Sequence, residues 1–345
     1  MLEVNSKIWQ EDIETIIKDE IINSFRNLSI LITGATGLIG KELVFSFLCA
    51  NRIKNLNIKI VALVRNTDKA KEIFKNIISN SNFEIIEQDI INPIKYSEKI
   101  DFIFHCANIT SSNKMIKMPI SVIDSTLMGT KNVLEFARKK SAKVIYLSSL
   151  EIYGRQFEQK EEIFEEDYGF LDSSNIRNCY PLSKKMAENM CFSYSYQYDL
   201  DVKIARLTQT FGAGVILNDN RFFSQLAKAI INNEEFILKT DGSSYKNYCY
   251  LTDTIRALFY IAIKGNKAEV YNVANYDSAI SIKDLVQKLI NKYKKSSLKF
   301  EIGDNPYNQN VYLKLNTKKL ESLGFSPQIN LEDMFTRLIM YLKGE

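Results

Sequence analysis

Histidine is almost absent from this chain: among 345 residues, His105 is the only one. A metal site built on several histidines is therefore excluded, and a catalytic triad with histidine would have to use His105. The cysteines are odd in number, widely spaced and free of any C-x-x-C pair: Cys49, Cys106, Cys179, Cys191 and Cys249. We therefore expect neither disulfides nor a bound metal, and a reduced, cytoplasmic protein.

Charge of one sign and long apolar runs are also missing. The chain has 45 basic and 41 acidic residues, a formal net charge of +4, which is too balanced to favour nucleic acid or an anionic membrane. No apolar run reaches the roughly 18 residues needed to span a bilayer. The N-terminus, Met-Leu-Glu-Val, soon becomes acidic and is unlike a signal peptide. We expect neither nucleic acid nor membrane as a partner.

What the chain does have is enough apolar residues, 46%, for a large core. Short runs rich in β-branched residues predict buried strands at 29–33, 58–64, 83–87, 101–105 and 143–148. Helical spacing predicts an amphipathic leading helix over 7–26 and further helices over about 41–50, 67–79 and 120–140. This alternation predicts an α/β fold, a Rossmann-type doubly wound parallel sheet.

The second half of the chain is less regular. We predict helices over about 180–197, 221–233 and 281–294, a strand over 201–207, loops in the rest of 212–247, and a helix at the end of the tail 314–343. No linker separates the halves, so a smaller C-terminal substrate lobe is expected to interleave with the sheet. The predicted division is a helical extension at 1–27, a dinucleotide-binding domain at 28–205 plus about 248–275, and a lobe at 206–247 and 276–345.

A glycine-rich turn ends the first predicted strand. Gly34, Gly37 and Gly40 stand between that strand and a helix. The first glycine permits the tight turn, the second lets the backbone approach a pyrophosphate, and the third lets helix and strand pack closely. The helix N-terminus then offers free N–H groups and a positive dipole end to the phosphates. The segment predicts a dinucleotide site, to which we also assign Thr36, Leu38 and Ile39; a plain turn is the alternative.

The ends of the next two strands bear on the choice of cofactor. Arg65 follows the second strand, where an arginine accommodates the 2′-phosphate of NADP and an acid would suit the free ribose of NAD. Arg65 therefore favours NADP slightly over NAD, unless it only faces solvent. Asp89 ends the third strand and is a candidate to bind the adenine amine, unless it only caps a loop.

A tyrosine and a lysine suited to proton transfer open a later helix. Tyr180 and Lys184 are four residues apart and so share one helix face. A lysine ammonium beside a phenol lowers the pKa of the tyrosine, which makes it a base for a substrate hydroxyl. Ser148 and Ser149 end the fifth strand at the sheet edge where open α/β folds bind ligands, and one of them is expected to bind the same oxygen. Chance spacing and strand capping are the alternatives.

Taken together, these segments resemble an extended short-chain dehydrogenase/reductase of the NAD(P)-dependent nucleotide-sugar epimerase/dehydratase group. The resemblance covers roughly residues 28–340. It rests on TGATGLIG (33–40), QDI (88–90), FHCAN (104–108), GTKNVLEFAR (129–138), LSSLEIYG (147–154), YPLSK (180–184), ARLTQTFGAG (205–214) and DGSSYKNYCYLTD (241–253).

The resemblance implies a role for each matching residue. Tyr180, Lys184 and Ser149 match the family's catalytic residues. Glu151 stands where dehydratases and UDP-glucuronate decarboxylases carry a working glutamate, unless it is a solvent-facing carboxylate. Further cofactor-binding positions are Ile90, Cys106, Ala107 and Asn108, and the resemblance assigns Tyr180 and Lys184 to cofactor binding as well.

Substrate binding is implied for Ser149, Gln209, Arg221 and Lys246, the last where the group usually has an arginine near the nucleotide diphosphate. The stretch 205–225 resembles UDP-glucuronate decarboxylases most closely.

The chain also departs from the family pattern. Leu150 replaces the acidic residue of typical 4,6-dehydratases, and Gln209 and Thr126 replace frequent asparagines. The stretch 311–318 contains no arginine, although decarboxylases use one near the carboxylate.

The function that the resemblance implies is an NDP-sugar epimerase/dehydratase acting through a 4-keto sugar, in the synthesis of bacterial surface polysaccharide. A UDP-glucuronate decarboxylase and an NADPH-dependent keto-sugar reductase are the enzymatic alternatives. A non-catalytic cofactor sensor is a third, which the intact Tyr180/Lys184 pair disfavours. Family members pair through two helices per subunit, which would make this protein a homodimer through about 120–140 and 180–197.

Overall fold

The computed structural model describes residues 4–158, 160–216, 219–294, 297–302 and 311–344. Its strands are β1 (Ser29–Thr33), β2 (Lys59–Val64), β3 (Phe83–Glu87), β4 (Phe102–His105), β5 (Lys143–Ser149), β6 (Val202–Leu207), β7 (Gln209–Phe211), β8 (Phe236–Leu238), β9 (Tyr245–Tyr250), β10 (Glu269–Val273), β11 (Asn275–Ser281), β12 (Leu298–Phe300) and β13 (Tyr312–Leu313).

Its helices are α1 (Lys7–Lys18), α2 (Leu38–Lys54), α3 (Thr67–Ile73), α4 (Ser112–Lys117), α5 (Pro119–Lys140), α6 (Cys179–Tyr198), α7 (Phe222–Asn232), α8 (Leu251–Lys264), α9 (Ile282–Tyr293), α10 (Lys318–Glu321) and α11 (Leu331–Lys343), with 3-10 turns η1 (Glu20–Phe25), η2 (Leu150–Tyr153) and η3 (Ile176–Asn178).

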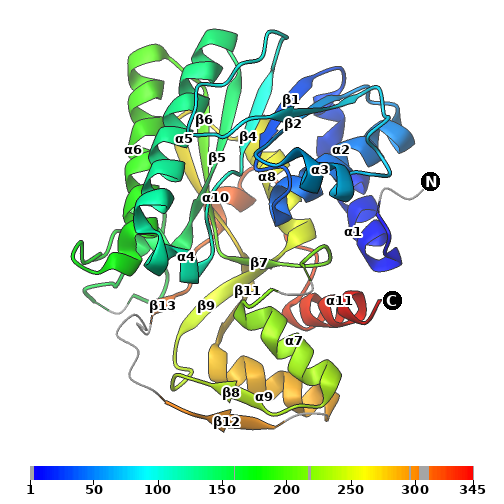
Figure 1. Cartoon of the computed structure of the whole chain (residues 1–345). Helices are drawn as coiled ribbons and strands as arrows, with labels where there is room; N and C mark the ends of the chain where they lie inside the picture. Colours follow the sequence, from blue (N-terminus) through cyan, green and yellow to red (C-terminus); the bar gives the residue numbers. More distant parts are fainter. Residues whose placement is uncertain (1–3, 159, 217–218, 295–296, 303–310, 345) are drawn as a thin grey trace.

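A seven-stranded parallel sheet forms the larger part of the molecule. Its strand order is β10-β6-β5-β4-β1-β2-β3, and helices cover both faces (Figure 1). The central strands are buried on both sides, which is why their sequences read as continuous apolar runs. The chain moves to one side of β1 for β2 and β3, then to the other side for β4, so the carboxyl ends of β1 and β4 flank a topological switch point. The predicted Rossmann-type α/β fold is confirmed.

A smaller lobe lies below the sheet in Figure 1. It holds the sheet of β11, β9, β13 and β7, the pair β12-β8, and helices α7, α9 and α11. Its core is separate, with Phe211, Phe223, Tyr250 and Phe335 among the buried residues. The expectation of loops and one helix over 212–247 was wrong, because β8 and the start of β9 lie within it. β9 reads YKNYCY, in which Lys246 and Asn247 are adjacent, so it lacks the strict apolar–polar alternation that signals a strand.

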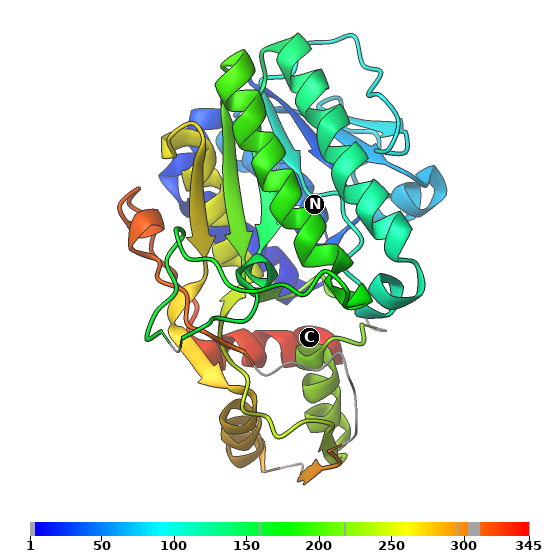
Figure 2. The same cartoon turned by 90° about the vertical axis from the view of Figure 1, so that its left-hand side faces the viewer.

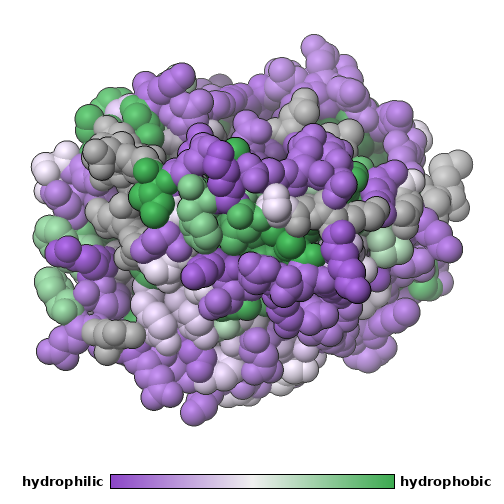
Figure 3. Space-filling view, turned by 90° about the horizontal axis from the view of Figure 1, so that it is seen from below, coloured by the Kyte–Doolittle hydropathy of each residue, from purple (hydrophilic) through white to green (hydrophobic). Residues whose placement is uncertain are grey.

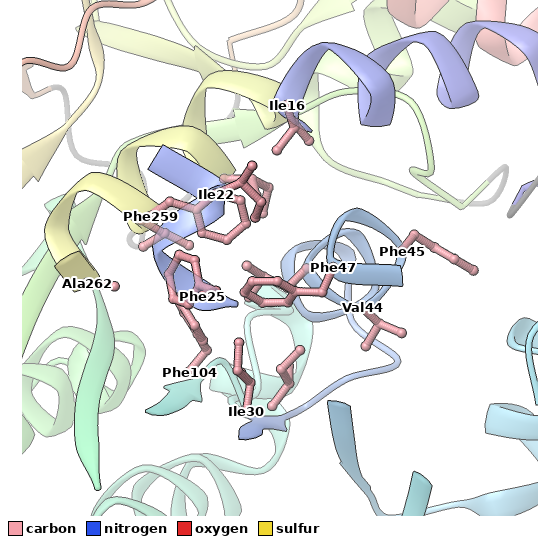
Figure 4. Close-up of a cluster of buried hydrophobic side chains, with 14 of the residues drawn as sticks. Ile16, Ile22, Phe25, Ile30, Val44, Phe45, Phe47, Phe104, Phe259 and Ala262 are labelled. Atoms are coloured by element: carbon pink, nitrogen blue, oxygen red, sulfur yellow. The ribbon is translucent and has the colours of Figure 1, made fainter. Parts of the chain in front are cut away.

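The leading segment is one helix in the prediction but two in the structure. α1 ends at Lys18, and Asp19 has an extended backbone before η1 begins. The Asp19 carboxylate accepts hydrogen bonds at 3.1 and 2.9 Å from Arg256 in α8, which favours the break. After it, Ile22 and Phe25 point into the core toward Phe47 and Phe259 (Figure 4). The helix predicted over 67–79 also ends early, at Ile73.

Membrane-spanning helices and metal clusters are both absent from the described residues. No helix in the part of the chain that the structure describes is long and apolar enough to cross a bilayer. Within the same ranges, no cluster of His, Cys, Asp and Glu has an arrangement that would hold a metal ion. Seen from below, hydrophobic side chains form a band across an otherwise mainly hydrophilic face (Figure 3).

Candidate active site

The glycine turn has the geometry that a dinucleotide requires. Gly34 has φ +65°, and a Cβ there would approach the Ala107 Cα to 2.7 Å. A Cβ on Gly40 would clash with the carbonyl oxygen of Gly34, so the first turn of α2 packs directly on the end of β1. Gly37 caps α2 without a side chain and leaves the N–H groups of the first turn open. The backbone thus forms a cradle: Gly34 and Gly40 allow the turn to pack closely, and Gly37 places no side chain before the open N–H groups of α2. A pyrophosphate fits this arrangement.

A cavity of about 560 Å³ starts at this cradle and runs between the large sheet and the lobe. Its wall combines predicted residues of all three kinds. Those from the cofactor group are Gly34, Gly37, Leu38, Ile39, Gly40, Cys106 and Asn108; those from the catalytic and substrate groups are Ser149, Glu151, Tyr180, Gln209, Arg221 and Lys246. The turn after β1, the start of α2, and residues of β5, α6, β7 and β9 therefore meet in one space, at the carboxyl edge of the large sheet.

The remaining predicted cofactor residues lie outside this wall, as far as the described residues form it. Thr36 and Ala107 belong to the glycine turn and to the loop against it. Arg65 is exposed after β2, and the Asp89 carboxylate after β3 accepts a hydrogen bond from the Ile91 N–H at 3.2 Å. Ile90 packs against Gly129. Arg65 and Asp89 thus lie at the same sheet edge as the turn, on the side away from Tyr180.

Tyr180 and Ser149 come together from different elements. Tyr180 lies in the first turn of α6 and is 7% exposed, and Ser149 ends β5. Burial raises the pKa of Tyr180 above its usual value and the Glu151 carboxylate raises it further, whereas a hydrogen bond from Ser149 lowers it. From the sequence we expected Lys184 to lower this pKa; in the structure burial and Glu151 outweigh any such effect, so the pKa is raised instead.

Lys184 lies one helical turn behind Tyr180 and is buried. Its Nζ donates to the carbonyl oxygen of Leu147 and lies 4.5 Å from the ring centroid of Tyr146. Burial lowers the pKa of Lys184 to about 8, and Glu188 opposes the shift. The side chain is thus held under the end of β5, on the face of α6 that carries Tyr180.

An ion pair that sequence reasoning missed lies opposite Tyr180. Arg177, in η3, places Nη1 2.9 Å from Glu151 Oε2 and donates from Nη2 to Oε1 at 3.1 Å. Both residues line the cavity and both are partly buried, with side-chain exposures of 18% and 35%. The signal for Arg177 was its position three residues before Tyr180, in the turn that leads into α6. Such two-point pairs between arginine and carboxylate are geometrically specific.

The predicted substrate residues line the lobe side of the cavity. Arg221 donates to the Asp219 carboxylate at 2.9 and 2.6 Å and covers the Phe223 ring. Lys246 has its pKa lowered by burial, while the Glu151 carboxylate opposes the shift. Lys246 therefore lines the cavity within range of an electrostatic interaction with Glu151.

The departures from the family pattern also have places in the structure. Leu150 lines the cavity beside Glu151 and is 6% exposed. Thr126 is buried in α5, and its hydroxyl donates to Val122 O at 2.7 Å and to Asn108 Oδ1 at 3.3 Å. Thr126 thus orients Asn108, a cavity residue.

With this geometry in view, the chain was compared with known proteins. The model of the NAD dependent epimerase/dehydratase family matches residues 30–274, which is well over half of the chain. The chain belongs to this family. The family membership, the expected enzyme class and the nicotinamide cofactor are thereby confirmed at the level of the family.

Among curated relatives, UDP-glucuronic acid decarboxylase 3 of Arabidopsis thaliana is 26% identical over 309 residues, covering 89% of this chain and 86% of the relative. UDP-glucuronic acid decarboxylase 1 of Xenopus tropicalis is 27% identical over 320 residues, covering 92% and 72%.

Solved structures confirm the fold. A dTDP-glucose 4,6-dehydratase from Bacillus anthracis in complex with NAD has a TM-score of 0.76 at 20% identity, covering 92% of this chain and 96% of that one. A UDP-glucuronic acid 4-epimerase from Bacillus cereus in complex with NAD has a TM-score of 0.73 at 23% identity, covering 92% and 97%. These neighbours catalyse different reactions on one fold, so the choice among reactions depends on the site.

Proposed function

We propose that this protein oxidises a hydroxyl of a nucleotide-diphosphate sugar to a ketone, at carbon 4, and that the keto sugar is then converted within the same cavity. The observation that carries the proposal is that Tyr180 and Ser149 share one cavity with the glycine cradle and with the Glu151–Arg177 pair. The synthesis of bacterial surface polysaccharide is the proposed setting.

The first step needs a base and a hydride acceptor. Tyr180 accepts the proton of the sugar hydroxyl, and Ser149 binds the same oxygen. The nicotinamide of NAD, when bound, supplies the hydride acceptor. Lys184 is the cation on the same helix face. Burial raises the pKa of Tyr180, so the phenol stays protonated at neutral pH in the protein alone. A bound nicotinamide with a positive ring would favour the phenolate, which is the form that accepts the proton.

The fate of the keto sugar depends on the groups at carbons 5 and 6. Epimerisation needs only rotation of the ketone and return of the hydride to its other face. Dehydration needs a free base near carbon 5, but the Glu151 carboxylate is held at two points by Arg177. The lead proposal is an epimerase/dehydratase-type reaction, and its dehydration branch requires Glu151 first to leave Arg177.

A specific observation favours UDP-glucuronate decarboxylation as the second candidate. Arg177 pairs with the Glu151 carboxylate, and Lys246 interacts electrostatically with the same carboxylate, so this part of the cavity offers two basic side chains to a sugar carboxylate. A ketone at carbon 4 is β to a carboxylate at carbon 6, so carbon dioxide can leave while its bonding electrons form an enolate. The decarboxylases among the curated relatives agree with this candidate.

The experiment is incubation of the purified protein with UDP-, GDP-, CDP- and dTDP-sugars, each neutral and as the uronate, with mass spectrometry and NMR of the products. An unchanged mass with a new sugar configuration means epimerisation, loss of water means dehydration, and loss of carbon dioxide means decarboxylation. If no nucleotide sugar reacts, the proposal is wrong.

Two further proposals concern the cofactor and the assembly. Exposed Arg65 supports tolerance of a 2′-phosphate, which titration with NAD and with NADP tests directly. A homodimer through α5 and α6 is proposed because these helices pack side by side at the surface (Figure 2).

A further inference from the structure

Helix α1 lies where the cofactor-binding and substrate-binding parts of the molecule meet. It packs against α2, which begins at the glycine turn, and against α8 and α11 (Figure 1). The isoleucines of α1 pack against these elements, as expected of a helix that buries an apolar face. In addition, Trp9 and Asp12 form hydrogen bonds with polar groups on both parts of the molecule.

Trp9 connects α2 with the segment that follows β7. Its indole Nε1 donates at 2.5 Å to Oε2 of Glu42, which lies two residues after Gly40 in α2. Its ring covers Gly214, where φ is +85° and where a Cβ would lie 2.8 Å from the indole. The backbone at Gly214 therefore depends on glycine and on the indole that packs against it.

Lys41 makes the same connection from the other side. Its Nζ donates to the carbonyl oxygen of Gly214 at 2.5 Å and lies 4.7 Å from the centroid of the Trp9 ring. Trp9, Lys41, Glu42 and Gly214 thus join the start of the cofactor helix to the chain beyond Gln209. The Lys41–Gly214 hydrogen bond is direct, and the indole of Trp9 packs over both of its residues.

Asp12 forms a hydrogen bond with the last residue of β9, Tyr250. Its carboxylate accepts from the Tyr250 hydroxyl at 2.7 Å and from Arg337 Nε at 2.6 Å. The Tyr250 hydroxyl in turn accepts from the Ala213 N–H at 3.3 Å. Tyr250 ends β9 and pairs with Phe211 of β7. Asp12 thus bonds directly to the end of β9, and it reaches the chain just after β7 through the Tyr250 hydroxyl. Both strands carry cavity residues.

We propose that α1 is a positioning element for the reaction: through Trp9 and Asp12 it sets the separation between the cofactor helix α2 and the strands β7 and β9, which carry Gln209 and Lys246. The inference rests on the proposed function in one respect, the role of β7 and β9 in binding the nucleotide sugar. Trp9 and Asp12 are positioning residues, because they act through Gly214 and Tyr250. Misplacement of binding groups by about 1 Å costs up to a hundred-fold in rate.

The test compares two variants in the same N-terminal segment. Trp9→Leu removes the contacts with Glu42 and Gly214. Ile22→Ala, the matched control, opens the core beside Phe25 and Phe259 and touches neither. Both are expected to lower the melting temperature. Calorimetry with UDP, CDP, GDP and dTDP first identifies the nucleoside diphosphate that the wild type binds. Only Trp9→Leu is expected to weaken binding of that diphosphate, by about ten-fold. Trp9→Phe should restore part of that affinity.

The two proposals fail in different ways. If none of the four diphosphates binds the wild type, the proposed function is wrong and the inference falls with it. If one of the diphosphates binds the wild type, and Trp9→Leu and Ile22→Ala bind it with equal affinity, the proposed function stands and the positioning role is refuted. Should Trp9→Leu not fold, Asp12→Asn decides by the same comparison, because it keeps the shape and loses the charge opposite Arg337.

A spectroscopic readout is independent of affinity. Trp9 is the only tryptophan in the chain, and it does not line the cavity as the described residues form it. The fluorescence emission of Trp9 in the wild type should nevertheless shift when the diphosphate that the protein binds is added, because the backbone at Gly214 packs against the indole. An emission spectrum that is unchanged at saturation would overturn the inference.

Discussion

Tyr180 shows how strongly the chemistry of one side chain depends on its neighbours. The phenol is buried against a carboxylate, so its pKa is raised, yet the proposed reaction needs it to accept a proton. Replacing Tyr180 with Phe removes the acceptor and keeps the ring. We expect turnover to fall by about a hundred-fold to ten-thousand-fold, while NAD binding measured by calorimetry stays the same.

The matched control is Tyr248→Phe, which removes another buried hydroxyl, one without a hydrogen-bond partner among the described residues. This variant should keep full turnover. Equal turnover in Tyr180→Phe and the wild type would rule out Tyr180 as the base.

Arg177 is the residue that best separates the candidate reactions. Arg177→Met removes one of the two cations that face Glu151 and keeps most of the side-chain volume. If the substrate is a uronate, kcat/KM with UDP-glucuronate should fall by about ten-fold to a hundred-fold, the scale of a lost charge-assisted contact. With UDP-glucose the fall should be smaller. Steady-state kinetics with both sugars checks this; equal losses would contradict a carboxylate-binding role.

At the scale of elements, the residues around α1 predict how the stability of the fold depends on pH. Burial raises the pKa of Glu42, in α2, to about 8, with Asp12 adding to the shift and Trp9 and Lys41 opposing it. The folded state therefore holds a proton that the unfolded chain releases above pH 4.5. Glu42 accordingly stabilises the fold most at low pH, and this contribution is lost as the pH rises toward 8.

Glu42→Gln removes that dependence. The difference in unfolding free energy, variant minus wild type, should increase steadily from pH 5 to pH 8 in denaturant titrations. Asp12, with its pKa raised to about 6, acts in the same direction at lower pH, and Lys41, with its pKa lowered to about 8, acts oppositely above 8. The exposed residue Glu72 provides the control: Glu72→Gln should leave the pH profile as it is. A flat difference for Glu42→Gln would contradict the assignment.

The elements differ in how far the sequence alone could predict them. β1, β2 and β4 are continuous apolar runs buried on both faces, and the glycine turn and the Tyr180–Lys184 spacing are local, so all of them were predictable. The break at Asp19 depends on Arg256, which is 237 positions away in the chain. The Glu151–Arg177 pair likewise requires the fold, since its partners are 26 positions apart across an irregular segment.

At the scale of the whole molecule, α5 and α6 present a surface that the described residues leave open. The two helices pack on each other and face outward (Figure 2). Apolar side chains exposed along them or at their ends include Met118, Ile120, Met128, Met186 and Tyr196, the last 95% exposed. Exposed apolar side chains gathered on two adjacent helices are typical of an interface between proteins. The same two helices from a second copy would complete a four-helix arrangement, in which each patch covers its own equivalent.

The homodimer prediction follows from that surface. A stable interface buries about 1,200–2,000 Å² in total, so the wild type should sediment as a dimer at micromolar concentration. Met128→Lys puts a charge in the middle of α5, where the two-fold contact would bring it near its own copy, and should shift the equilibrium to monomer without changing the melting temperature measured at low concentration. Ile53→Lys, at an equally exposed apolar position on α2, should leave the dimer intact. A wild type that sediments as a monomer, or equal behaviour of the two lysine variants, would show that this face is covered by something other than a second copy.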